Sequence, residues 1–271
     1  MPTAQSRKAR TFADLHAAAP SFVIANAWDA GTARILTGLG FPALASSSGA
    51  AAGSLGRRDG RISRDEALAH ARAIVEATDL PVSADLENGY GDTPADCALT
   101  ICGAISAGLV GGSIEDFSGR SLYPEDIAID RVAAAVAVAR AAPFPFVLTA
   151  RCENFIRGNP DLDDTIGRLK AYEAAGADVL MAPGLPDLDA VRKVCKALGK
   201  PFNFMGGMPG KSFSVAELQA AGVKRISLAT SLYRAAMTGL VDAAREVRES
   251  GTFGYLDGTL KTAELNAWMK D

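Results

Sequence analysis

Histidine, paired cysteine and long apolar runs are scarce or missing in this sequence. It contains two histidines, His16 and His70, and four cysteines, none of which forms a CxxC pair. Unpaired cysteines are typical of a protein that keeps its thiols reduced. We expect neither histidine to be catalytic, because both lie in helix-like polar stretches away from any cluster of carboxylates or cysteines.

Membrane-spanning and export signals are also missing. No run of about 18 apolar residues occurs, and the first residues, MPTAQSRKARTFADLHAA, have no apolar signal core. The net charge of −3 gives no basic surface for nucleic acid or for an anionic membrane. We therefore expect a soluble cytoplasmic protein whose partner is a small molecule, with no nucleic acid and no membrane.

A repeated pattern is what the sequence does contain. Eight short apolar runs alternate with stretches of helical period such as 64–77, 125–141, 162–175 and 232–249, and glycine often ends the helical stretch. No Gly-x-Gly-x-x-Gly follows the first run, so the usual signature of an open dinucleotide-binding sheet is missing. The pattern predicts an α/β fold, a closed (β/α)8 TIM barrel. The eight runs are 22–28, 42–48, 81–87, 111–116, 146–152, 177–183, 201–206 and 225–230.

The two ends of the chain lie outside this repeat. Residues 1–10 are polar and basic and are expected to be a frayed tail, with a short helix at 12–19. No linker divides residues 1–271, so we expect one domain. Residues 250–271 form a C-terminal helical extension with apolar side chains, which we expect to pack on a neighbouring subunit.

The segment Pro81–Tyr90, PVSADLENGY, ends a predicted strand with two carboxylates. Strand alternation places Asp85 and Glu87 on the same side, where their like charges favour a cation between them. The same residue types also mark a strand that turns into a loop. From this segment alone, both interpretations remain open.

Polar residues at other strand ends favour the cation. Glu115 adds a third carboxylate, and together with Asp85 and Glu87 it predicts a Mg²⁺ site, with Mn²⁺ possible, because hard cations prefer oxygen ligands. The guanidinium of Arg151 matches a substrate carboxylate in two hydrogen bonds, although an ion pair with Glu153 or Glu115 is the alternative. Ser46, Ser47, Ser48 and Gly49 offer hydroxyl and N–H groups to an anion, or simply end a strand with small residues.

The segment 53–61, GSLGRRDGR, is long for a strand-to-helix loop. Its glycines suit a mobile lid, and Asp59 at its tip is a candidate general acid or base. A solvated surface loop is the alternative.

Five segments in order resemble the isocitrate lyase/phosphoenolpyruvate mutase superfamily, over residues 20–240. They are NAWDAGTARIL, ASSSGAAAGSLGRRDG, SADLENGYG, SIEDFSG and LTARCENFIRG. The resemblance implies that Asp85 binds Mg²⁺ directly and that Glu87 and Glu115 hold it mainly through water. It also implies substrate contacts from residues 46–49, Arg151 and Asn203, a gating loop that carries Asp59, and a homotetramer that exchanges its last barrel helix.

The segment after Glu115 departs from the superfamily pattern. Lyase members carry a Cys and a His there, whereas this chain reads Phe117-Ser-Gly-Arg-Ser-Leu-Tyr-Pro124, and residues 181–184 lack the His and Ser of phosphonate-processing members. We therefore expect a Mg²⁺-dependent carbon–carbon lyase or decarboxylase that acts on a small 2-oxo or 2-hydroxy dicarboxylic acid, oxaloacetate-like or malate-like, through an enolate. Asp59 and Arg151 are the predicted catalytic residues, with Tyr123 as a further acid–base candidate.

Three alternatives remain open. The missing acid–base residues favour a 2-oxo-acid-binding protein with little catalysis. A methylisocitrate lyase-like or phosphonopyruvate-processing enzyme is less favoured because its motif residues are absent. An aldolase that forms a Schiff base is disfavoured because no predicted strand end carries a lysine.

Overall fold

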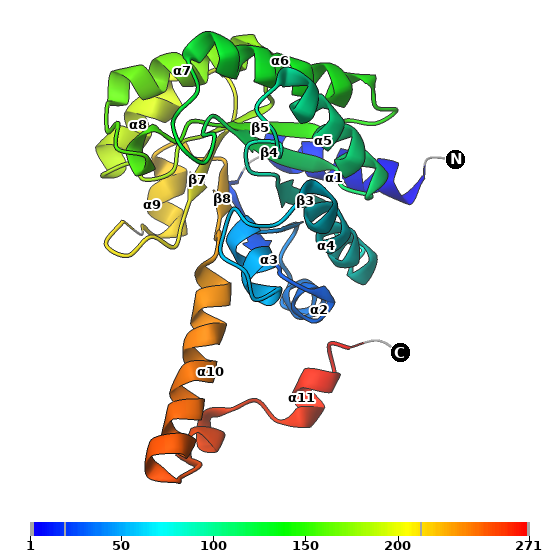
Figure 1. The fold of residues 1–271 in the computed structure, drawn as a ribbon, viewed down its shortest axis with the longest axis vertical. Coiled ribbons are helices and arrows are strands. Elements are labelled where there is room, and N and C mark those ends of the chain that lie inside the picture. The colour runs from blue at the N-terminus through cyan, green and yellow to red at the C-terminus, as the bar shows by residue number, and fades with distance from the viewer. Residues whose placement is uncertain (1–2, 19, 212, 270–271) are drawn as a thin grey trace.

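The strands form a closed parallel barrel with helices around it (Figure 1). The computed structural model describes residues 3–18, 20–211 and 213–269. Within them each strand pairs in parallel with the next, and β8 pairs with β1 to close the barrel. The strands are β1 (Phe22–Asn26), β2 (Leu44–Ala45), β3 (Val82–Asp85), β4 (Gly111–Glu115), β5 (Val147–Arg151), β6 (Val179–Met181), β7 (Phe202–Met205) and β8 (Arg225–Ser227). Each strand lies within one of the eight apolar runs, so the predicted (β/α)8 barrel is confirmed.

Helices begin where a side chain caps the first turn. Ser63 accepts a hydrogen bond from Glu66 N–H at the start of α4, and Thr93 does the same for Asp96 at the start of α5. The helices predicted at 64–77 and 125–141 match α4 and α6. The helices are α1 (Ala4–Ala17), α2 (Ala30–Gly38), α3 (Ser48–Ser54), α4 (Arg64–Ala77), α5 (Pro94–Ser106), α6 (Glu125–Ala141), α7 (Leu162–Ala174), α8 (Leu188–Ala197), α9 (Val215–Ala220), α10 (Ser231–Ser250) and α11 (Thr262–Asn266), with 3-10 turns η1 (Asn154–Ile156) and η2 (Gly254–Gly258).

The N-terminal segment corrects the expectation of a frayed tail. Helix α1 begins at Ala4, and its buried residues Ala9 and Phe12 pack in one cluster with the amino-terminal ends of several strands, including Phe22. The apolar face of α1 is only a few residues wide and lies among basic residues, so its pattern is weak in the sequence. Residues 1–2 of the predicted tail and Ala19 of the predicted short helix lie outside the described residues.

His16 is buried on the same face of α1, in contrast to the polar surroundings expected for it. Its Nε2 lies 3.2 Å from Nη1 of Arg225, which can only donate, so Nε2 is the acceptor. Nδ1 then carries the proton and donates to the Phe12 carbonyl at 2.7 Å. His16 is therefore the neutral imidazole in the folded protein.

Protonation of His16 should make stability depend on pH. Burial, followed by the charge of Arg225, lowers the pKa of His16 to about 3. The unfolded chain, with a pKa of about 6.5, binds this proton more tightly, so stability is complete above pH 6.5 and falls as the pH drops. We expect a loss of about 1.4 kcal/mol per pH unit below that point. Urea unfolding at pH 7.5 and 5.0 should show this loss in the native chain, and equal losses in His16→Gln would contradict the assignment.

The C-terminal arm, α10 to α11, extends away from the barrel and turns back beneath it (Figure 1). Helix α10 has no buried residue, and apolar side chains such as Leu240, Val241 and Leu256 are exposed. At the end of the arm, the side chain of Trp268 contacts Gly38 of α2 in the same chain. Across the described part of the chain, every helix is too short or too polar to cross a membrane.

Candidate active site

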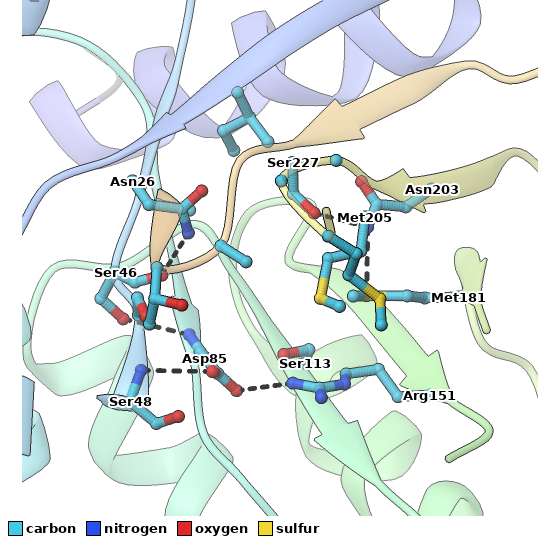
Figure 2. A pocket seen from close by; sticks show the side chains of 18 of the residues that line it. Asn26, Ser46, Ser48, Asp85, Ser113, Arg151, Met181, Asn203, Met205 and Ser227 are labelled. Carbon is cyan, nitrogen blue, oxygen red and sulfur yellow. Dashed lines mark hydrogen bonds and ion pairs between the residues drawn. The ribbon is translucent and has the colours of Figure 1, made fainter. Parts of the chain in front are cut away.

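A cavity of about 360 Å³ opens at the carboxyl-terminal ends of the strands. Figure 2 shows polar side chains from opposite sides of the barrel pointing into it. Residues of the predicted substrate site that line it are Ser46, Ser47, Ser48, Asp59, Asp85, Arg151 and Asn203. A second polar cavity, of about 840 Å³, is lined in part by residues 59–64 and shares four lining residues with the first, Ser48, Asp59, Arg151 and Arg157.

Asp85 at the end of β3 is held from two sides (Figure 2). Ser48 N–H donates to Oδ2 at 3.2 Å, and Arg151 Nη1 donates to Oδ1 at 3.0 Å. The Asp85 N–H donates to Ser46 Oγ at 3.0 Å, so β2 and β3 are joined at the rim of the cavity. These contacts fix the carboxylate where a ligand would enter.

Arg151 lies among three carboxylates. Its guanidinium contacts Asp85 at 3.0 Å, Glu115 at 3.1 Å and Glu153 at 2.7 Å. Arg151 therefore forms the ion pairs with Glu153 and Glu115 that were the alternative prediction, and it also lines the cavity, as the substrate-binding prediction requires. Glu153 is fully buried and orients Arg151. With all three ionised, negative charge exceeds positive charge at this place.

Glu87 differs from the expected strand geometry. Strand β3 ends at Asp85, and Glu87 has a φ of +49°, a conformation that side-chain-bearing residues rarely adopt. Its side chain lines the second cavity, and its buried Oε1 has no hydrogen-bond partner. Burial, then the charges of Asp85 and Asp59, raises the pKa of Glu87 to about 7. Burial also raises the pKa of Glu115, although Arg151 opposes that shift.

The carboxylates of Asp85, Glu87 and Glu115 are the groups that the resemblance assigns to Mg²⁺. Among the described residues, no three or more His, Cys, Asp or Glu side chains converge closely enough to hold an ion directly. The orphaned oxygen of Glu87 and the carboxylate oxygens of Asp85 and Glu115 do suit a hard divalent cation. The donor set therefore fits a hard divalent cation, and Asp85, Glu87 and Glu115 are the residues that would hold it.

The predicted lid segment borders both cavities through its last residues. Helix α3 extends through Ser54, so the irregular part is shorter than expected, and Arg57 pairs with Glu66 of α4 at 2.6 Å. Asp59 is exposed yet lines both cavities. A Cβ at Gly49 would lie 3.2 Å from Asp59 Oδ2 and 2.9 Å from Thr230 Cγ2, so the absence of a side chain at Gly49 makes room for both.

Gly49→Ala should therefore disturb Asp59 more than it disturbs the fold. We expect kcat to fall on the order of tenfold, because small misplacements of a reacting group are costly. Gly167→Ala is the matched control, since a Cβ at that exposed helical position meets nothing within 4 Å. Equal kcat values for the two variants, measured at equal melting temperature, would contradict this role of Gly49.

Asn203 is held with a defined amide orientation. Its Oδ1 accepts from Arg225 Nε at 2.8 Å, so its Nδ2 is the donor, toward Ser227 Oγ and Met181 Sδ, both at 3.1 Å. Figure 2 shows Asn203 and Ser227 side by side across the cavity from Asp85. The amide thus presents a donor to the interior of the barrel.

Tyr123, the further acid–base candidate, lines neither of the two cavities. Its hydroxyl donates to Asp92 at 2.6 Å and accepts from Asn88 at 3.0 Å, while Arg131 stacks on its ring. Burial and the hydrogen bond to Asp92 raise the pKa of Tyr123 to about 12. These contacts hold Tyr123 outside the two cavities, so the structure does not bring it together with Asp59 and Arg151, and its acid–base role stays a prediction.

Several polar residues of the cavity were not singled out from the sequence. Asn26 ties β2 to β8 by donating to Ser46 O at 2.6 Å and accepting from Leu228 N–H at 3.0 Å. Ser83, Ser113, Ser227 and Arg225 also line the cavity. Each is a polar residue within an otherwise apolar strand. Because side chains alternate along a strand, such a residue can face the barrel interior, and this pattern could have identified them from the sequence.

Comparisons with known proteins agree with this geometry. A sequence model of the family described as phosphoenolpyruvate phosphomutase matches residues 12–248. The chain is 31% identical to 2-methylisocitrate lyase of Escherichia coli K12, covering 80% of this chain and 76% of that protein. It is 28% identical to 2,3-dimethylmalate lyase of Eubacterium barkeri, covering 91% and 89%. A solved structure from Burkholderia cenocepacia J2315, provisionally named a lyase/mutase, superposes with a TM-score of 0.96 at 50% identity, covering 98% and 97%.

These relatives are carbon–carbon lyases or mutases by name, and their matches cover most of this chain. The predicted resemblance is confirmed, and the chain is an enzyme of that class. It belongs to the isocitrate lyase/phosphoenolpyruvate mutase superfamily.

Proposed function

We propose that the protein is a Mg²⁺-dependent lyase or decarboxylase that breaks a carbon–carbon bond in a small 2-oxo or 2-hydroxy dicarboxylic acid. The observation that carries the proposal is the position of Arg151, which lines the cavity 3.0 Å from Asp85 and 3.1 Å from Glu115. An arginine among carboxylates at the end of a barrel strand can clamp a substrate carboxylate while a cation balances the remaining charge.

Different residues of the site have different proposed roles. Arg151 and the 46–49 segment bind the 2-oxo acid end, and Asp85, Glu87 and Glu115 hold the ion. When bound, Mg²⁺ would supply positive charge beside the oxygens on which negative charge develops. In a 2-oxo acid the carboxyl group leaves as CO2, the electron pair of its bond passes into an enolate, and Asp59 delivers a solvent-derived proton to the enolate carbon. In a 2-hydroxy acid Asp59 would first take the hydroxyl proton as the hydroxyl carbon becomes a carbonyl, and would then return that proton to the enolate of the other fragment.

A binding protein with little catalysis is the second candidate. Its support is the composition of the two cavities, whose described lining residues include no His, Cys or Lys. That composition also opposes a Schiff-base aldolase. Thermal stabilisation by 2-oxoglutarate with no product by NMR would favour this candidate over the lyase.

A wild-type screen separates the two candidates. Oxaloacetate and substituted malates are incubated with the protein in Mg²⁺ or in EDTA, and products are followed by NMR. We expect turnover of at least one acid in Mg²⁺ and loss of that turnover in EDTA. Turnover that EDTA leaves unchanged would contradict the proposed metal dependence.

We also propose a homotetramer that exchanges α10 between subunits. The exposed apolar residues of α10 and of the segment after it would then be covered, because isolated chains rarely leave such large apolar surfaces in water. Light scattering after gel filtration should give a tetramer for the full chain and a smaller assembly for the variant Leu240→Glu/Val241→Glu, which places charge on the exposed apolar face of α10. A monomer for the full chain would contradict the exchange.

A further inference from the structure

Arg225 is a buried cation that no carboxylate of the described residues neutralises. It is 5% exposed and lies at the start of β8, next to Asn203 in the barrel register. Its guanidinium donates to three neutral groups, Asn203 Oδ1 at 2.8 Å, Thr149 Oγ1 at 2.8 Å and His16 Nε2 at 3.2 Å. Burial lowers the pKa of Arg225 to about 9, which leaves it charged at neutral pH.

An uncompensated charge inside a barrel is costly unless something pairs with it. Arg131, another buried arginine with no carboxylate partner among the described residues, shows how a protein can cover such a charge. Its guanidinium donates to the Asn88 and Thr93 carbonyls and stacks on the Tyr123 ring. Arg131 lines neither of the two large cavities, whereas Arg225 lines the substrate cavity.

The groups around Arg225 suit an anion. Arginine has more N–H donors than the three contacts use. Ser83 and Ser113 are buried serines that line the same cavity. Asn203 Nδ2 and Ser227 Oγ lie beside them, and the orientation of this amide is set by Arg225 itself.

We propose that this floor of the cavity is a subsite for the second carboxylate of a dicarboxylic substrate, with Arg225 as the residue that selects it. The inference rests on the proposed function, which places the 2-oxo acid end at Asp85 and Arg151. The distal carboxylate then points down the barrel axis and pairs with Arg225 and the surrounding donors. Arg157 at the mouth is the competing position, but it already pairs with Glu153 at 3.3 Å and stacks on Phe117.

Matched ligands test the subsite. 2-Oxoglutarate and 2-oxopentanoate have the same chain length and the same 2-oxo acid end, and differ only in the distal carboxylate. Titration calorimetry in Mg²⁺ should show 2-oxoglutarate binding to the native chain at least tenfold more tightly. Arg225→Gln should remove that preference while changing 2-oxopentanoate affinity less than threefold, and Arg225→Lys, which keeps the charge, should retain part of it.

Two comparison variants complete the test. Arg192→Gln replaces an exposed arginine and should leave the preference for 2-oxoglutarate intact. Arg157→Gln removes the competing position for the distal carboxylate. Loss of the preference in Arg157→Gln but not in Arg225→Gln would overturn the subsite. Equal weakening of both acids in Arg225→Gln would assign it a structural role only. If the Arg225 variants do not fold, the native chain alone decides. Binding of 2-oxoglutarate less than threefold tighter than binding of 2-oxopentanoate overturns the subsite, and binding at least tenfold tighter supports it.

Failure of the subsite and failure of the lyase are distinguishable. The distal-carboxylate preference without any turnover would support the subsite and contradict the proposed reaction. Mg²⁺-dependent turnover with equal affinity for the two acids would overturn the subsite alone. If neither acid binds, both are overturned.

Discussion

Asp85→Ala should reduce kcat/KM on the order of a thousandfold in saturating Mg²⁺. Asp85 is the proposed direct ligand of the ion, and its carboxylate also holds Arg151 at 3.0 Å and the Ser48 N–H at 3.2 Å. Its removal takes away the charge that binds the ion and frees the guanidinium that binds the substrate. The measurement is a steady-state assay with the acid found in the substrate screen.

Two further variants show whether this loss is specific. Asp85→Asn keeps the shape and a hydrogen-bond acceptor but removes the charge, so it should lose nearly as much activity as alanine. Asp189→Ala removes an exposed carboxylate that pairs with Arg192 on the same helix, and the activity of this variant should be unchanged. Activity of Asp85→Ala within tenfold of the native chain would contradict the proposed role.

Arg151→Ala should weaken binding of 2-oxo acids by about a hundredfold, equivalent to roughly 2–3 kcal/mol. It should also destabilise the fold, because Glu153 is 0% exposed and Arg151 donates to it at 2.7 Å. Breaking a buried ion pair costs about 3–5 kcal/mol, and Arg157, which lies 3.3 Å from Glu153, should offset part of that loss. Calorimetric binding and urea unfolding measure the two effects separately.

A double variant separates binding from stability. Arg151→Met combined with Glu153→Gln removes both charges of the buried pair, so it should recover much of the lost stability. It should not recover affinity, because the substrate carboxylate still lacks its partner. Recovery of affinity in the double variant would show that Arg151 acts only by supporting the fold.

The barrel and much of the site were predictable from the sequence for a physical reason. Strands buried on both faces are continuous apolar runs, and polar residues at their ends must meet at one rim. This logic brought Ser46, Asp85 and Arg151 together without any knowledge of side-chain contacts.

Two kinds of feature could not be predicted from the sequence. One is a departure of the backbone from regular strand geometry, and the other is a contact between residues far apart in the chain. Alternation failed at Glu87 because β3 ends two residues earlier and the chain turns into a positive φ. The buried role of α1 depends on how His16 meets Arg225, 209 positions away. The charge of Arg225 gave no signal in the sequence, since nothing there shows that its partners are neutral.

The central claim is that Asp85 and Arg151 form a cation-dependent site for the 2-oxo acid group. Titration calorimetry with oxalate, a compact analogue of that group, tests it most directly in Mg²⁺ and in EDTA. We expect binding at least tenfold tighter in Mg²⁺, with the difference lost in Asp85→Asn. Equal affinity in Mg²⁺ and EDTA, or an unchanged difference in Asp85→Asn, would contradict the claim.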